Sequence, residues 1–134
     1  MRIEDIEGIG PAQTAKLTAA GVSSTDDLLA KAGLRAGRAA LAEATGISPK
    51  LLLEWVNLAD LMRIKGIGEE FSDLLEAAGV DSPAELAQRN AANLATTFQE
   101  LDAARPDVVR RVPSEAVVAG WIEQAKALPP VVEH

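Results

Sequence analysis

The side chains that carry out chemistry in most enzymes are scarce in this chain. It has no Cys and no Tyr, and its one histidine, His134, is the last of the 134 residues. The lack of cysteine excludes thiolate nucleophiles, disulfides, cysteine-ligated zinc and iron–sulfur clusters. The carboxylates are scattered along the chain, and no phosphate loop of the form GxxxxGK[ST] occurs. We therefore expect no enzyme activity, no cofactor, no metal site and no functional role for His134.

A short Gly-Ile-Gly sequence occurs twice in the chain. Ile-Glu-Gly-Ile-Gly at residues 6–10 returns as Ile-Lys-Gly-Ile-Gly at residues 64–68, and 11 of the 23 positions from 6 to 28 are identical at this offset of 58. Glycine permits backbone angles closed to other residues and lets a ligand approach closely. The predicted turn residues are Gly8, Ile9, Gly10, Gly66, Ile67 and Gly68. We expect none of the four glycines to be replaceable by a larger residue, because positive φ angles disfavour other residues.

Helices must position these turns. Only 3% of the residues are aromatic and no segment alternates with period two, so an all-α fold of closely packed helices is predicted. Pro residues at first helical positions, Gly residues after last ones and Ser capping boxes mark the helix ends. The expected helices cover about residues 11–20, 25–32, 36–45, 49–62, 69–78, 83–89, 91–104 and 114–128.

The repeat predicts a compact domain made of two halves, residues 1–62 and 63–128, followed by a short tail, 129–134. The second half is longer, and we place its extra residues around 105–107 and 112–113. Helical spacing puts Val117, Trp121, Ala125 and Leu128 on one apolar face of the last helix. The predicted core is Ile9, Leu17, Val22, Leu28, Leu41, Ile47, Leu52, Trp55, Leu58, Ile67, Leu75, Val80, Leu86, Leu94, Val118, Trp121 and Ile122. For the two tryptophans, the alternative to core packing is a platform on which bases stack.

The apolar-x-Gly-apolar-Gly turn followed by a helix of about ten residues resembles the helix-hairpin-helix family. The matching residues are Ile6, Gly8, Ile9, Gly10, Ala15 and Leu17, and then Ile64, Gly66, Ile67, Gly68, Leu74 and Leu75. Two copies resemble the tandem arrangement usual for that family. Nearly the whole chain, including residues 41–61 and 111–129, is also similar to an uncharacterised family of small bacterial proteins, which implies a fold and no function.

In many helix-hairpin-helix domains the turn amides and the following helix hold a nucleic-acid phosphate. The resemblance, with the nearby basic residues, gives as candidate phosphate-binding residues Gly8, Gly10, Ala12, Gln13, Lys16, Lys31, Arg35 and Arg38. In the second copy Glu69 and Glu70 follow Gly68. Carboxylates there stabilise the helix start and compete with a phosphate, so this copy is poorly suited to DNA. For both turns the alternative is a purely structural role.

Charge is distributed unevenly along the chain. The net charge is -7, yet residues 31–65 hold six basic and three acidic side chains, including Lys31, Arg35, Arg38 and Lys50. This patch could contact phosphates or could be a solvated face. A nucleic-acid binder usually has an excess of basic residues, and the net negative charge opposes approach to DNA.

Two functions remain open. The first is a non-catalytic protein-interaction or adaptor domain with a protein partner. The alternative is weak, sequence-independent binding of the DNA backbone through the first turn. No apolar run approaches the length of a membrane span, so we expect a cytoplasmic protein without a membrane partner. The oligomeric state is left open.

Overall fold

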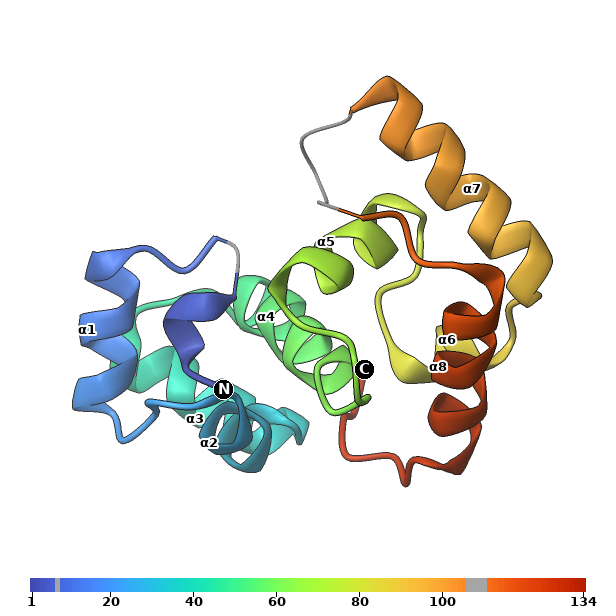
Figure 1. The fold of residues 1–134 in the computed structure, drawn as a ribbon. Coiled ribbons are helices and arrows are strands. Elements are labelled where there is room, and N and C mark those ends of the chain that lie inside the picture. The colour runs from blue at the N-terminus through green and yellow to red at the C-terminus, as the bar shows by residue number, and fades with distance from the viewer. Residues whose placement is uncertain (7, 106–110) are drawn as a thin grey trace. The chain divides into compact units, whose positions relative to one another are not determined.

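A computed structural model describes residues 1–6, 8–105 and 111–134, and the regular secondary structure of these residues consists of helices (Figure 1). In chain order the elements are the 3-10 helix η1 (Ile3–Asp5) and the α-helices α1 (Pro11–Ala19), α2 (Thr25–Ala32), α3 (Arg35–Thr45), α4 (Pro49–Leu61), α5 (Glu69–Ala77), α6 (Pro83–Ala87), α7 (Ala91–Ala104) and α8 (Glu115–Ala127). Within the described residues the only β-type pairing is one isolated antiparallel bridge, between Arg2 and Ser24. The predicted all-α class is confirmed.

Several of these helices begin after an N-cap residue with a short polar side chain. Ser24, Ser82 and Ser114 each accept a hydrogen bond from the main-chain amide three residues later, and Asn90 does the same through its side-chain oxygen. Such bonds satisfy amides that have no partner within the helix. The capping residues therefore fix the helix starts, and the eight predicted α-helices are confirmed to within two residues at each end.

The chain folds into two compact units. Unit 1 is Met1–Asp60 together with Val131–His134, and unit 2 is Leu61–Pro130. The segment at 131–134 thus belongs with the first sixty residues. The extra residues that we expected in the second half fall partly on 106–110, which lie outside the described residues.

The 17 residues predicted to form the core are all buried, and Ile9, at 7% exposed, is the most accessible of them. The prediction missed other apolar side chains that are buried: Ile3, Ile6, Val56, Leu61, Ile64, Leu74 and Phe98. Several of these lie in turns or at helix ends, where no periodic pattern marks them. Trp55 and Trp121 are each 2% exposed, so they are core residues and the base-stacking alternative is wrong.

The predicted apolar face of α8 is wrong at Val117. This residue is 46% exposed, whereas its neighbour Val118 is fully buried. The buried stripe of α8 consists of Val118, Trp121, Ile122 and Ala125, so Trp121 and Ala125 are buried as predicted. Val118 takes the place that we gave to Val117, three residues before Trp121 and still at helical spacing.

The two Gly-Ile-Gly turns have the same local geometry. The φ angle is +92° at Gly8 and +95° at Gly66. In each turn the amide of the central isoleucine donates to the carbonyl three residues earlier, at 3.2 Å for Ile9 and 3.1 Å for Ile67. Only the first glycine of each turn thus needs a backbone angle that other residues rarely adopt.

The reason that we gave for expecting all four turn glycines to be irreplaceable, a positive φ, does not hold at Gly10 and Gly68. These residues are the N-caps of α1 and α5, with φ angles of -84° and -112°. Negative φ is ordinary backbone for an N-cap. At Gly10 a Cβ atom would also meet nothing within 4 Å.

The positive-φ glycine of each Gly-Ile-Gly turn lies next to a buried indole of its own unit. A Cβ atom added at Gly8 would lie 3.5 Å from Nε1 of Trp55, and one added at Gly66 would lie 3.0 Å from Nε1 of Trp121. The missing side chain thus lets each tryptophan lie directly against its turn. Each turn is in this way attached to the core of its unit.

Candidate functional site

The start of α1 has the features expected of a phosphate-binding turn. Gly10 is the N-cap, no side chain caps it, and the first helical turn holds no acidic residue. Gly8, Ala12 and Lys16 are exposed. Gln13 is half-buried, and its Oε1 atom is buried without a hydrogen-bond partner. Unpaired amides and the helix dipole favour an anion at such an end.

The corresponding end of α5 carries negative charge. Gly68 is its N-cap, and Glu69 and Glu70 occupy its first turn. The two copies therefore share a backbone geometry and differ in charge at the position where a phosphate would lie.

Lys31 lies at the opposite end of α1 from the turn. Its Nζ atom donates to the main-chain oxygen of Ala20, at 3.3 Å, and Ala20 is the C-cap of α1. The nine residues of α1 span about 13 Å at the usual helical rise. The structure therefore does not bring Lys31 to the Gly8–Gly10 turn, and its charge is placed on the last carbonyls of α1, where the helix dipole favours a cation.

Residues next to Lys31 connect α1 to α2. The amide of Ser23 donates to the carboxylate of Asp27 at 3.1 Å, and the amide of Asp27 donates to Oγ of Ser24. This arrangement resembles a capping box, except that Asp27 accepts from the residue before the N-cap Ser24. The hydrogen bond from the Ser23 amide is the main cause that holds the pKa of Asp27 below its ordinary value. Desolvation opposes this shift, and smaller contributions from Ser24 and Lys31 lower the pKa further.

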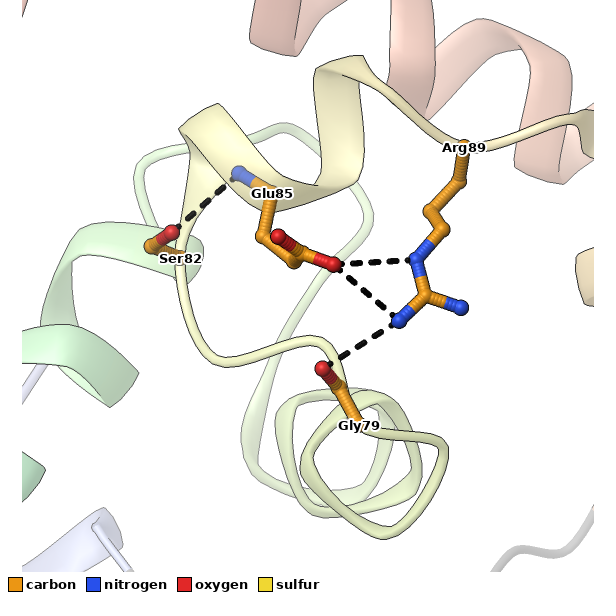
Figure 2. Close-up of polar contacts among 4 residues, drawn as sticks. All are labelled: Gly79, Ser82, Glu85 and Arg89. Atoms are coloured by element: carbon orange, nitrogen blue, oxygen red, sulfur yellow. Dashed lines mark hydrogen bonds and ion pairs between the residues drawn. The ribbon is translucent and has the colours of Figure 1, made fainter.

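In unit 2 the corresponding connection joins α5 to α6, with Glu85 and Arg89 in place of Asp27 and Lys31 (Figure 2). Arg89 donates from Nε to Oε1 of Glu85 at 3.2 Å and from a terminal nitrogen to the main-chain oxygen of Gly79 at 3.3 Å. Oγ of Ser82 accepts from the amide of Glu85. Ser82, Glu85 and Arg89 stand 58 residues after Ser24, Asp27 and Lys31, respectively. The basic residue of each copy thus joins a short helix to the end of the preceding one.

Arg38 is buried, with 5% of its surface exposed. One terminal nitrogen donates to the main-chain oxygens of Ala32 and Gly33, at 3.0 and 3.1 Å. The other donates to the main-chain oxygen of Glu133 at 2.6 Å. The guanidinium therefore bridges the end of α2 and the segment at 131–134.

Arg35 holds the same segment from the start of α3. Its Nε donates to the main-chain oxygen of His134 at 2.8 Å, and its amide donates to the carboxylate of Glu133 at 3.0 Å. The N-cap of α3 is Leu34, whose side chain cannot accept a hydrogen bond. The carboxylate of Glu133 supplies the missing acceptor and lies where the helix dipole favours negative charge.

Two further contacts complete this arrangement. The amide of Glu133 donates to the oxygen of Gly33 at 2.9 Å. Nε2 of His134 lies 2.9 Å from Oδ1 of Asn57, and it is the donor because a carbonyl oxygen only accepts. A Cβ atom at Gly33 would lie 2.5 Å from the main-chain oxygen of Val131. The groups that hold the segment are referred to below as the arginine seat: Gly33, Arg35, Arg38 and Asn57.

The structure thus separates the predicted phosphate-binding residues into three groups. Gly8, Gly10, Ala12, Gln13 and Lys16 lie at the turn and on α1, Lys31 lies at the far end of α1, and Arg35 with Arg38 forms the arginine seat. The phosphate role of these residues stays a prediction. Sequence reasoning missed Gly33 and Glu133, and a partner nearly a hundred residues distant gives no local signal that could have found them.

Two further properties concern only the part of the chain that the structure describes. No three of its His, Asp or Glu side chains gather into a group that could hold a metal ion. None of its helices has the length and apolar character needed to cross a bilayer.

The chain matches one known protein family. The model of a domain of unknown function, DUF4332, matches residues 7–128. No curated protein and no solved structure gives a significant match.

Proposed function

Since the chain belongs to the DUF4332 family of domains of unknown function, we propose from its own geometry that it is a non-catalytic protein-interaction module. In this proposal the arginine seat of unit 1 binds a short non-helical segment of a protein. The domain then acts as an adaptor, without chemistry of its own.

The observation behind the proposal is that the arginine seat binds main-chain groups. Arg35 and Arg38 donate to main-chain oxygens of residues 133 and 134, and Gly33 accepts from a main-chain amide. Recognition of main-chain donors and acceptors is how proteins bind peptide segments irrespective of most side chains. Planar guanidinium groups suit such acceptors because they offer several donors in a fixed geometry.

Charge supports a protein partner over a nucleic acid. The net charge of -7 repels DNA at long range. Three of the basic side chains in residues 31–65, those of Lys31, Arg35 and Arg38, donate to oxygens of the chain itself. A group already occupied in this way contributes less to the release of counterions from phosphates.

We also propose that the two turns form a tandem helix-hairpin-helix. The shared positive φ at Gly8 and Gly66 supports it, as do the equivalent hydrogen bonds of Ile9 and Ile67. The resemblance to small bacterial proteins is part of the same proposal.

The second candidate function is weak binding of the DNA backbone at the first turn. It is favoured by the uncapped start of α1, without acidic residues, and by exposed Lys16 in the last turn of the same helix. Because Lys31, Arg35 and Arg38 donate to oxygens of the chain itself, we expect a dissociation constant no tighter than about 10⁻⁴ M near physiological salt. Base-specific recognition is not expected, because no basic helix offers contacts along a major groove.

Two titrations on one protein distinguish these functions. The protein is an open-seat variant, which lacks residues 131–134, so that no main chain of this segment occupies the arginine seat. It is used to select peptides from a random displayed library, and it is titrated with a labelled DNA duplex at low and moderate salt. The proposal expects selected peptides whose binding is lost with Arg35→Glu and kept with Lys50→Glu, a change of the same charge at another exposed basic residue.

The opposite pattern would contradict the proposal. Failure to select any peptide, together with micromolar duplex binding that falls steeply with salt and is lost with Lys16→Glu, would make DNA binding the function. Lys16 is the appropriate variant for this arm because it lies on α1 and outside the arginine seat.

A further inference from the structure

Glu133 makes three different hydrogen bonds at the arginine seat. Its amide donates to the oxygen of Gly33, its main-chain oxygen accepts from Arg38, and its carboxylate accepts from the amide of Arg35. The arginine seat thus binds the amide, the main-chain oxygen and the carboxylate of Glu133 at the same time. A shorter or neutral side chain at this position would leave the start of α3 without its charged acceptor.

The seat is also shaped for close approach of a main chain. A Cβ atom at Gly33 would come within 2.5 Å of the main-chain oxygen of Val131. A Cβ atom there would also lie 2.5 Å from the main-chain oxygen of Leu29, so a side chain at residue 33 would collide with α2 as well as with the segment. The lack of a side chain lets the segment lie directly against the end of α2, where the amide of Glu133 reaches the oxygen of Gly33.

The segment that occupies the seat is held mainly by polar contacts. Glu133 and His134 are exposed, and Val131 and Val132 are only half-buried. Parts of a protein with little buried apolar surface open at a low free-energy cost. The segment is therefore one of the more readily displaced parts of unit 1.

We propose that Val131–His134 is an internal competitor at the arginine seat, whose partner is a glutamate-containing, non-helical segment of another protein. This inference rests on the proposed function and adds the partner's chemistry and its regulation. The tethered segment acts at an effective concentration of about millimolar, because its linker is short. A partner segment displaces the internal segment when it binds the seat more strongly. Contacts between the partner protein and other parts of the domain can add to this binding.

A labelled peptide with the sequence of residues 128–134, Leu-Pro-Pro-Val-Val-Glu-His, tests this directly. Its fluorescence anisotropy is titrated with the full chain and with the open-seat variant, after circular dichroism has shown equal helix content. We expect affinity for the open-seat variant to be at least about tenfold higher, because the internal competitor is gone. The same peptide with Gln in place of its Glu should bind at least about fivefold more weakly, since it lacks the charged acceptor.

Two variants control for effects on folding. Glu133→Gln in the full chain removes only the charge of the internal segment, and it should strengthen binding of the labelled peptide by about threefold or more. Arg35→Glu in the open-seat variant should abolish binding, whereas Lys50→Glu should leave it unchanged.

Equal affinities of the peptide for the full chain and the open-seat variant would overturn the proposal. It would also fail if the Glu and Gln peptides bound equally. If this peptide fails to bind while library-selected peptides bind at Arg35, the inference is wrong and the proposed function stands. If no peptide binds and DNA does, both are wrong.

Discussion

Lys31 and Arg89 lie 58 residues apart, and each donates a hydrogen bond of 3.3 Å to a main-chain oxygen at the end of an earlier helix, α1 or α5. The acceptors are the oxygens of Ala20 and Gly79. A basic side chain here satisfies carbonyls that the helix leaves without partners, and it complements the helix dipole. Lys31 therefore has a structural role that its counterpart in unit 2 shares.

Replacement of Arg89 tests this role. Arg89→Ala removes the bonds to Gly79 and Glu85, and we expect the free energy of unfolding to fall by about 0.5–1 kcal/mol, a small value because the side chain is 35% exposed. Arg89→Lys should cost less than about 0.5 kcal/mol, since Lys31 makes the corresponding bond in unit 1. Urea denaturation measures both.

The control for Arg89 is Lys126→Ala, which breaks the more exposed ion pair with Glu123. It should change the free energy of unfolding by less than about 0.5 kcal/mol. A loss in Lys126→Ala as large as in Arg89→Ala would mean that the bond to the Gly79 oxygen contributes nothing.

The glycines of the two turns should differ in their tolerance of a methyl group. Gly8→Ala should lower the free energy of unfolding by about 1–3 kcal/mol, because its φ is +92°. Gly66→Ala should cost at least as much, since the added carbon would also lie 3.0 Å from Nε1 of Trp121. Gly10→Ala is the control, and we expect a change within about 0.5 kcal/mol because its surroundings are open. Equal losses at Gly8 and Gly10 in denaturation curves would be inconsistent with the turn geometry.

Neighbouring valines in α8 provide a matched pair. Val118→Ala removes buried apolar surface and should lower the free energy of unfolding by on the order of 2 kcal/mol. Val117→Ala should be neutral within about 0.5 kcal/mol, because Val117 is exposed. Both changes have the same effect on helix propensity. The difference between the two variants in thermal or urea unfolding therefore measures the contribution of burial. If Val117→Ala lost more stability than Val118→Ala, the assignment of the buried face of α8 would be wrong.

Asp27 should make stability depend on acid pH. Its pKa is lowered in the folded chain, chiefly by the hydrogen bond from the Ser23 amide. A lowered folded pKa means that the contribution is present above the unfolded pKa, about 4, and is lost as the pH falls toward the folded value. Asp27→Asn should therefore be less stable than the wild type at neutral pH, and the difference should shrink below about pH 4.

Urea denaturation at several pH values checks this expectation. Asp26→Asn, which removes the same charge one residue earlier, controls for net charge. A difference between Asp27→Asn and the wild type that stays constant from pH 7 to about pH 3 would show that the carboxylate's ionisation does not contribute.

Much of the fold could be predicted because its signals are local. Ser24 and Ser82 mark helix starts by their own hydrogen bonds, so their positions in the sequence were sufficient. The Gly-Ile-Gly sequence could not reveal which glycine has the positive φ, because both positions hold the same residue type. The contacts of Gly8 with Trp55 and of Gly66 with Trp121 join residues more than forty positions apart, so no local pattern marks them. Phe98 was missed in the core because it is an isolated aromatic residue among polar neighbours.

The arginine seat could not be predicted in the same way. The sequence marks Arg35 and Arg38 as basic, but their acceptors on Glu133 and His134 lie more than ninety residues later. Nothing in a window of neighbouring residues distinguishes an arginine that binds phosphate from one that binds a main chain. Only the folded arrangement of unit 1 shows these acceptors.

The most direct test of the account is the rate of hydrogen exchange at the Glu133 amide, which donates to Gly33 at 2.9 Å. Measured by NMR on the full chain, it should exchange at least about tenfold more slowly than in the free peptide of residues 128–134. Arg35→Ala, which removes the bond to His134 from an exposed side chain, should speed the exchange of Glu133 and leave that of core amides such as Val22 unchanged. Exchange at the free-peptide rate in the wild type would contradict the claim that the arginine seat holds this segment.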